Sequence, residues 1–169
     1  MDVKVIMVCT GDAHGAAVTE TGAVCAWGSY RTTNGEWAFN QNTLDAKKAM
    51  FPFQIYTPAS SNERVTTITS GVDHMLALTQ QGAVYSWGCS EKGRLGRFGE
   101  DEAEDNDRAS DALKKRLLTP GRVSFGKSGG GGLGSAFGGD HVVTAIVAGD
   151  FHSIAICANA DGSQSDVYG

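Results

Sequence analysis

Residues 65–88 read VTTITSGVDHMLALTQQGAVYSWG, which is an apolar run, a Gly-x-x-His turn, a second apolar run, a Gln-Gly turn and a third run ending in Trp-Gly. Residues 5–28 repeat this order as VIMVCTGDAHGAAVTETGAVCAWG, and in both copies the tryptophan follows the first glycine of the turn by 16 positions. Short apolar runs separated by glycine turns predict antiparallel hairpins, not helices. Each copy is therefore predicted to form a small β-meander.

A third copy occupies residues 143–169, where it is longer by three residues and has Tyr168 in place of the tryptophan. One meander cannot bury its apolar face alone, so successive copies must pack on each other, and radial packing gives a β-propeller. We expect an all-β fold with about three blades, from repeats near 3–62, 63–142 and 143–169. Because propellers usually have about four to eight blades, we interpret the chain as a partial propeller, a fragment or a truncated product.

Composition narrows the function classes. Of 169 residues, 41% are hydrophobic and 20% charged, which is ordinary for a globular domain, and the net charge of −5 argues against the whole chain wrapping a nucleic-acid backbone. No stretch approaches the roughly 20 apolar residues that span a bilayer, so we expect no membrane partner. The four cysteines form no Cys-x-x-Cys pair and lie mostly in apolar, strand-like stretches, where a free thiol behaves as a small hydrophobic side chain. We therefore expect a reducing compartment.

Two long connectors separate the copies. The first, residues 29–62, contains Asn34-Gly35, a strong signal for a hairpin turn. The second, residues 99–142, opens with the acidic run 100–107, which we expect to be solvated by mutual repulsion. A short helix should follow, capped by Ser110 or Asp111 and stopped by Pro120, and then a glycine-rich linker.

Other chemistry is poorly supported by the sequence. One histidine stands at the same position in each copy: His14, His74 and His152. Because they belong to separate blades, we expect them to make structural hydrogen bonds and not to bind a metal ion. The glycine run 129–134 lacks the order of a phosphate-binding loop. No catalytic pairing stands out, so we expect no cofactor, no small-molecule substrate and no covalent chemistry.

The repeated Gly-x-x-His and Gly-x-Val-Tyr-x-Trp-Gly patterns resemble the repeat of the regulator of chromosome condensation family. The resemblance implies a seven-bladed propeller and, from the family's chromatin-bound exchange factor, guanine-nucleotide exchange on the small GTPase Ran. The stretches 88–97 and 113–120 are also similar to that factor's central blades. A nuclear, chromatin-associated location is implied, with a cytoplasmic one as the alternative.

Residues 28–35, Gly-Ser-Tyr-Arg-Thr-Thr-Asn-Gly, are similar to the family's β-wedge, the hairpin that loosens nucleotide and magnesium on the GTPase. The GTPase-binding residues that we predict are Arg31, Asn34, Gly35, Trp37, Asp12 and Asp73. The last two match aspartates implicated in exchange, although both could equally serve as turn residues. Trp37 has no counterpart in the repeat, so two alternatives stay open: exposure at a partner surface, or packing under its own loop.

Two further points concern the partners of the chain. Family members contact the nucleosome through arginines of a loop that matches residues 126–139, but here that loop keeps only Lys127 as a basic residue, which weakens the prediction of histone or nucleosome contact. The second is that the chain is a repeat module that binds some other protein or serves as a scaffold, since fold alone does not imply function.

Overall fold

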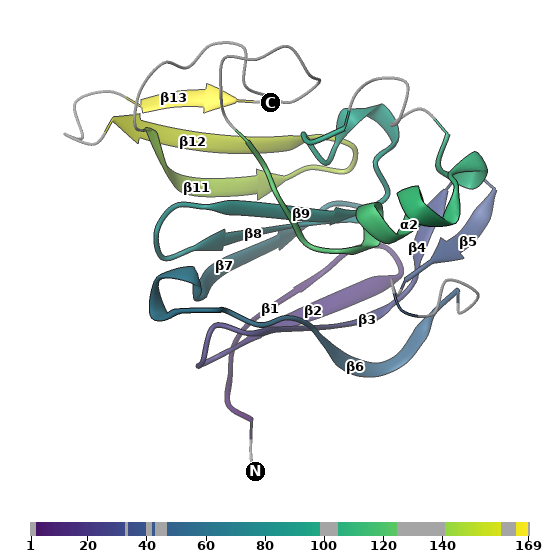
Figure 1. Cartoon of the computed structure of the whole chain (residues 1–169), viewed down its shortest axis with the longest axis horizontal. Helices are drawn as coiled ribbons and strands as arrows, with labels where there is room; N and C mark the ends of the chain where they lie inside the picture. The colour runs from purple at the N-terminus through teal and green to yellow at the C-terminus, as the bar shows by residue number, and fades with distance from the viewer. Residues whose placement is uncertain are drawn as a thin grey trace.

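Three antiparallel sheets, stacked side by side, form most of the protein (Figure 1). The computed structural model describes residues 3–32, 34–39, 42, 47–98, 105–124, 141–159 and 165–168. The first sheet, blade 1, has the strand order β1-β2-β3-β6. Its strands are β1 (Val5–Thr10), β2 (His14–Thr19), β3 (Val24–Gly28) and β6 (Ala49–Tyr56).

Blades 2 and 3 repeat this plan. Blade 2 is ordered β10-β9-β8-β7, from β7 (Val65–Ser70), β8 (His74–Thr79), β9 (Val84–Gly88) and β10 (Gly121–Arg122). Blade 3 is ordered β11-β12-β13, from β11 (His141–Ala148), β12 (Ser153–Asn159) and β13 (Ser165–Tyr168). The all-β class and the three-bladed partial propeller are confirmed.

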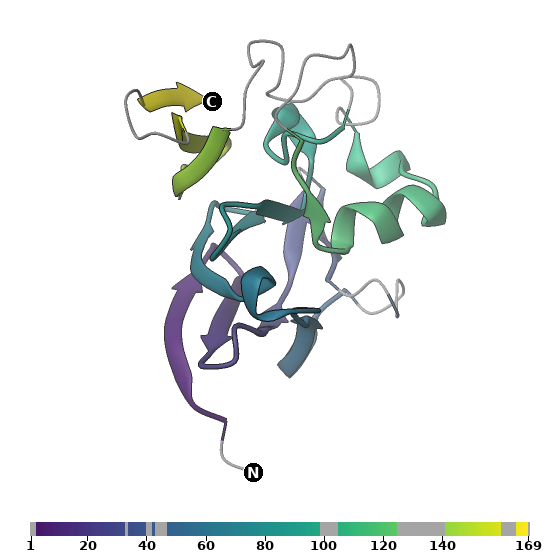
Figure 2. The same ribbon diagram turned by 60° about the vertical axis from the view of Figure 1, so that its left-hand side comes forward.

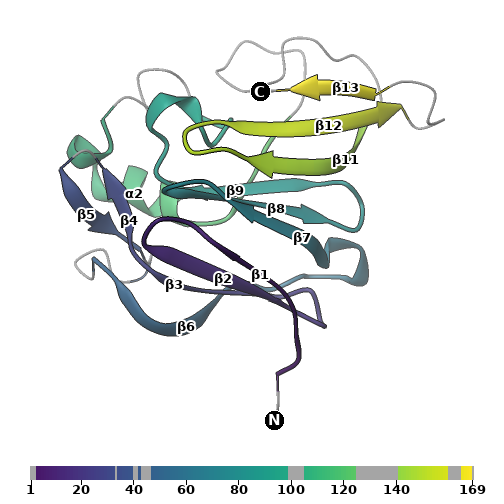
Figure 3. The ribbon, with the colours of Figure 1, turned by 180° about the vertical axis from the view of Figure 1, so that it is seen from behind.

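The connectors carry the remaining elements. Strands β4 (Tyr30–Thr32) and β5 (Gly35–Ala38) form a separate hairpin inserted between β3 and β6 of blade 1. Short 3-10 helices span Ser61–Glu63, Glu91–Gly93 and Asn106–Arg108, and helix α2 spans Asp111–Leu118. The hairpin and α2 lie at the same side of the stack in Figures 1 and 3, and Figure 2 shows α2 across the molecule from β1.

Helix α2 forms where the sequence predicts it. The hydroxyl of Ser110 accepts a hydrogen bond from the N–H of Leu113 at 3.2 Å, so Ser110 is the cap. Leu117 and Leu118 are fully buried in the main core. The guanidinium of Arg97 donates to the carbonyls of Arg116 and Thr119, which binds the last turn of the helix to blade 2.

The cores lie between the blades. One cluster joins blades 1 and 2 around the fully buried Trp87, Tyr30 and Phe39. A second joins blades 2 and 3 through side chains such as Leu76 and Ile146. Because each blade buries its faces against its neighbours, the packing explains why the repeat recurs in tandem.

The Gly-x-x-His turns form the joints between blades. The imidazole of His74 lies over Gly71 so closely that a Cβ on this glycine would stand 2.2 Å from Cε1 of the ring and 2.4 Å from the carbonyl oxygen of Gly149. The ring then reaches the next blade, where Nε2 is 2.9 Å from Oγ of Ser153. His14 likewise lies 2.7 Å from Ser70. The motif therefore needs a glycine because the histidine ring takes the place of a side chain.

Backbone hydrogen bonds run through the same joints. The N–H of Asp12 donates to the carbonyl of Val72 at 3.1 Å, and the N–H of Val72 donates to the carbonyl of Asp150 at 3.2 Å. These three residues occupy the same position after the glycine of each turn. Neighbouring blades are therefore held in a fixed register at their turns.

The two buried histidines are neutral. Burial lowers the pKa of His14 to about 4, and burial followed by the charge of Arg94 lowers the pKa of His74 to about 3. The hydroxyl of Ser153 donates to the carbonyl of Arg94 at 2.6 Å, so Nε2 of His74 must carry the proton that it shares with Ser153.

Candidate functional site

The β4–β5 hairpin is built around the Asn34-Gly35 turn that the sequence predicts. Strand β4 pairs with β5 in antiparallel register, with Thr32 opposite Gly35 and Arg31 opposite Glu36. Gly35 has a φ of +106°, and it has no atom near the position of a Cβ, so backbone conformation and not space requires glycine here. The predicted hairpin is confirmed.

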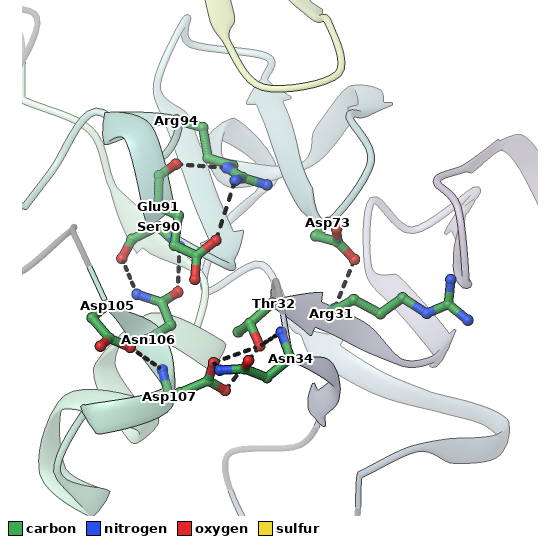
Figure 4. Close-up of polar contacts among 10 residues, drawn as sticks. All are labelled: Arg31, Thr32, Asn34, Asp73, Ser90, Glu91, Arg94, Asp105, Asn106 and Asp107. Carbon is green, nitrogen blue, oxygen red and sulfur yellow. Dashed lines mark hydrogen bonds and ion pairs between the residues drawn. The ribbon is translucent and has the colours of Figure 1, made fainter.

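The base of the hairpin meets both predicted aspartates. The backbone N–H of Arg31 donates to Oδ1 of Asp73 at 2.7 Å, and its guanidinium Nη1 lies 2.7 Å from Oδ2 of Asp12 (Figure 4 shows the contact with Asp73). Three predicted site residues, from two blades and one connector, are thus brought together.

The two aspartates differ in environment. About half of the Asp12 side chain is exposed, whereas Asp73 is only 6% exposed. Burial raises the pKa of Asp73, against the opposing effects of the Arg31 N–H and the charge of Arg94. Asp12 directly follows the glycine of its turn and Asp73 stands one position later, so they are not equivalent by repeat position. Asp12 is therefore the accessible carboxylate and Asp73 the buried one.

The tip of the hairpin is held by a residue that the sequence did not single out. The carboxylate of Asp107 accepts hydrogen bonds from the Thr32 hydroxyl at 2.8 and 2.9 Å and from the Asn34 side-chain amide at 2.5 Å (Figure 4). The expectation of a solvated run is wrong for this end of it, because Asp107 is half-buried and Asn106 fully buried. Residues 100–104 lie outside the described part of the chain.

A polar network fixes the residues next to Asp107. Asn106 pairs with Ser90 in both directions, at 2.7 Å from the Ser90 N–H to Oδ1 and at 2.8 Å from Nδ2 to the Ser90 hydroxyl. Arg94, 3% exposed, donates to the carbonyl of Glu91 at 2.7 Å. The only sequence signal for this network is the capping chemistry of Asp105, whose carboxylate accepts the N–H groups of Asp107 and Arg108.

Trp37 does not present its ring to a partner. Only 7% of it is exposed, and it belongs to the core between blades 1 and 2. The structure thus favours the alternative of packing under its own loop, and any effect of Trp37 on a partner would be indirect. Arg31 and Asn34 are the exposed side chains of the hairpin among the predicted residues.

Other sites are not apparent in the described residues. No group of three or more His, Cys, Asp and Glu side chains is placed there to hold a metal ion. No helix within the described ranges is long and apolar enough to cross a membrane. The four cysteines are thiols, and burial raises the pKa of Cys89 to about 12. The glycine run 129–134 and the rest of the 126–139 loop lie outside the described residues.

Two family models described as the regulator of chromosome condensation (RCC1) repeat match the chain, at residues 65–94 and 81–156. The chain belongs to the RCC1-repeat family. It is 40% identical over 117 residues to the regulator of chromosome condensation of Mus musculus, a match that covers 69% of this chain and 25% of that protein. It is 31% identical over 94 residues to the guanine nucleotide exchange factor SRM1 of Saccharomyces cerevisiae, covering 56% and 19%.

Among solved structures, Prp20p of Saccharomyces cerevisiae matches with a TM-score of 0.63 and 22% identity, covering 95% of this chain and 30% of that chain. At this identity the likeness shows the RCC1 propeller fold alone. The matches span about a fifth to a third of these relatives, so the activities and partners of the whole proteins remain proposals for this chain.

Proposed function

We propose that the chain acts in guanine-nucleotide exchange on the small GTPase Ran, with the β4–β5 hairpin as the inserting element. The observation that carries the proposal is the convergence of Asp12, Asp73 and Arg31 at the base of this hairpin. These residues come from separate segments, and the family resemblance selects them from the sequence alone: Arg31 by the match to the wedge, and Asp12 and Asp73 by the match to aspartates implicated in exchange.

The mechanism requires no covalent step. An exchange factor accelerates nucleotide release by binding the nucleotide-free GTPase more tightly than the loaded form, so the gain comes from differential binding. The hairpin would be inserted beside the nucleotide site, with Arg31 and Asn34 exposed for contact and Asp12 beside them. A hairpin that is already ordered loses little conformational entropy on insertion.

The names and descriptions of two relatives support this proposal. SRM1 is named a guanine nucleotide exchange factor, and the Prp20p structure is described with its binding to Gsp1p and histones. By extension we propose a nuclear, chromatin-associated location for this chain. Histone contact is the weaker part of the proposal because residues 126–139 contain only Lys127 as a basic residue.

A protein-binding scaffold is the second candidate. Two observations favour it: the guanidinium of Arg31 is already paired with Asp12, and the ring of Trp37 is buried, so these two side chains have partners within the chain. A scaffold would bind its partner through the blades and would tolerate changes in the hairpin.

Release of fluorescent GDP from Ran separates the two candidates. It is measured with this chain and with a hybrid in which the chain replaces the matching residues of the mouse relative. We expect the combined change Arg31→Ala and Asp73→Asn to abolish stimulated release without unfolding the protein, while Arg122→Ala, a change at another exposed arginine, has little effect. Full activity of the double variant would contradict the exchange function.

A further inference from the structure

We infer that Asp107 is a positioning residue that fixes the direction of the β4–β5 hairpin, so that blade 2 and its connector set the orientation of an element inserted between β3 and β6 of blade 1. The consequence for nucleotide exchange rests on the proposed function. Asp107 is 75 positions from Thr32 and 73 from Asn34, so the contact is a long-range feature of the fold.

The Asp107 carboxylate binds two residues at the tip of the hairpin. Thr32 ends strand β4, and Asn34 lies in the turn that leads to β5. One carboxylate therefore accepts hydrogen bonds from a hydroxyl at the end of β4 and from a side-chain amide in the turn. Hydrogen bonds to a charged acceptor are shorter and stronger than neutral ones, so a single carboxylate can hold the tip.

Asp107 is itself held in place. The Asp105 carboxylate caps the short helix that carries Asp107. The adjacent Asn106, with no exposed surface, both accepts from and donates to Ser90, which lies just after β9 of blade 2. Because Asp107 is fixed relative to blade 2, its hydrogen bonds fix the hairpin relative to blade 2 as well.

Two attachment points define a direction, whereas one does not. Asp73 holds the base of the hairpin through the Arg31 N–H, and Asp107 holds the tip (Figure 4). Without Asp107 the hairpin would keep its base but could swing at its tip. In the exchange reaction, part of the binding energy would then be used to order the tip, and that part would no longer be available to distort the GTPase.

The test compares Asp107→Ala, Asp107→Asn and the control Asp111→Asn, which changes an exposed acid four positions away. Hydrogen exchange of peptides covering residues 29–39 is the first measurement, because it needs no partner. We expect Asp107→Ala to speed exchange in these peptides about tenfold while residues 65–79 keep their protection. Asp107→Asn retains one acceptor oxygen and should give an intermediate result, and the control should match the parent chain.

Stimulated GDP release is the second measurement, made in the hybrid with the mouse relative. We expect Asp107→Ala to lower the maximal stimulated rate about tenfold with a small change in the half-saturating concentration, and Asp107→Asn to restore part of it. Unchanged hydrogen exchange in residues 29–39 of Asp107→Ala would overturn the positioning role. Faster hydrogen exchange with full GDP release would overturn its importance for exchange, whereas no release with the parent hybrid would contradict the proposed function alone.

Discussion

At the residue scale, the Gly-x-x-His turn is the best-explained motif of the chain. The sequence identifies it as a repeat marker, but its purpose is visible only in three dimensions, where the histidine ring covers its own glycine and bonds to the next blade. In the candidate site, too, some residues can be identified from the sequence and others only from the structure. Resemblance selects Arg31, Asp12 and Asp73, whereas Asp107 escapes notice because an aspartate within an acidic run looks solvated unless its distant partners are known.

Gly71→Ala tests the packing of this turn. The added Cβ would collide with the His74 ring and with the Gly149 carbonyl, so we expect a loss of about 3 kcal/mol in the free energy of unfolding, measured with urea. Gly93→Ala is the control, because Gly93 has a φ of +74° but open space around it, and should cost only about 1 kcal/mol. Equal losses for the two variants would contradict the proposed role of the glycine.

Acid should weaken the joints between blades. The pKa values of His14 and His74 are lowered in the folded chain, so the unfolded state binds more protons once the pH falls below about 6.5. Stability should therefore be fully present above this pH and fall by about 1.4 kcal/mol per pH unit for each histidine, toward their folded pKa values near 4 and 3.

Urea unfolding between pH 7 and pH 5 measures this loss, and His74→Gln should remove about half of the slope. The raised pKa of Asp73 acts in the opposite direction, because protonation of that buried carboxylate favours the folded state. A slope that is the same in the parent chain and in His74→Gln would contradict the neutral state of His74, because the effect of Asp73 is common to both proteins.

At the element scale, hairpins and the short helix could be predicted from local chemistry, but the outer strands of the blades could not. Strand β6 lies at the sheet edge and contains Pro52, which removes a backbone donor and makes the segment look like a loop. Strand β10 has only two residues. Both are strands because a neighbour in the sheet offers hydrogen bonds, which is a tertiary effect.

Equivalent strands also differ according to their neighbours. Val8 in β1 and Ile68 in β7 occupy the same position of the repeat, yet Val8 is 65% exposed and Ile68 is 3% exposed because blade 1 covers it. Ile68→Glu should cost about 4 kcal/mol or more of unfolding free energy, since it buries a charge, whereas Val8→Glu should change it by about 0.5 kcal/mol or less. Chemical denaturation of the two variants checks this, and similar losses would show that β1 is covered in solution.

At the scale of the whole molecule, the chain is a set of three blades joined by turns, with a hairpin fixed from blade 2. Exposed apolar side chains gather on β1 of blade 1, at Val5, Ile6, Met7 and Val8, and on blade 3, at Val142, Val147, Phe151 and Val167. The repeat could be predicted because it recurs in the sequence, whereas the way in which blade 2 holds the hairpin depends on residues more than 40 positions apart.

Release of fluorescent GDP from Ran is the measurement that decides whether the chain acts in nucleotide exchange. With the hybrid that carries this chain in the frame of the mouse relative, we expect accelerated release that disappears when Arg31→Ala and Asp73→Asn are combined. Acceleration that survives both changes, or a hybrid that leaves the rate of release at its spontaneous value, would contradict the exchange function.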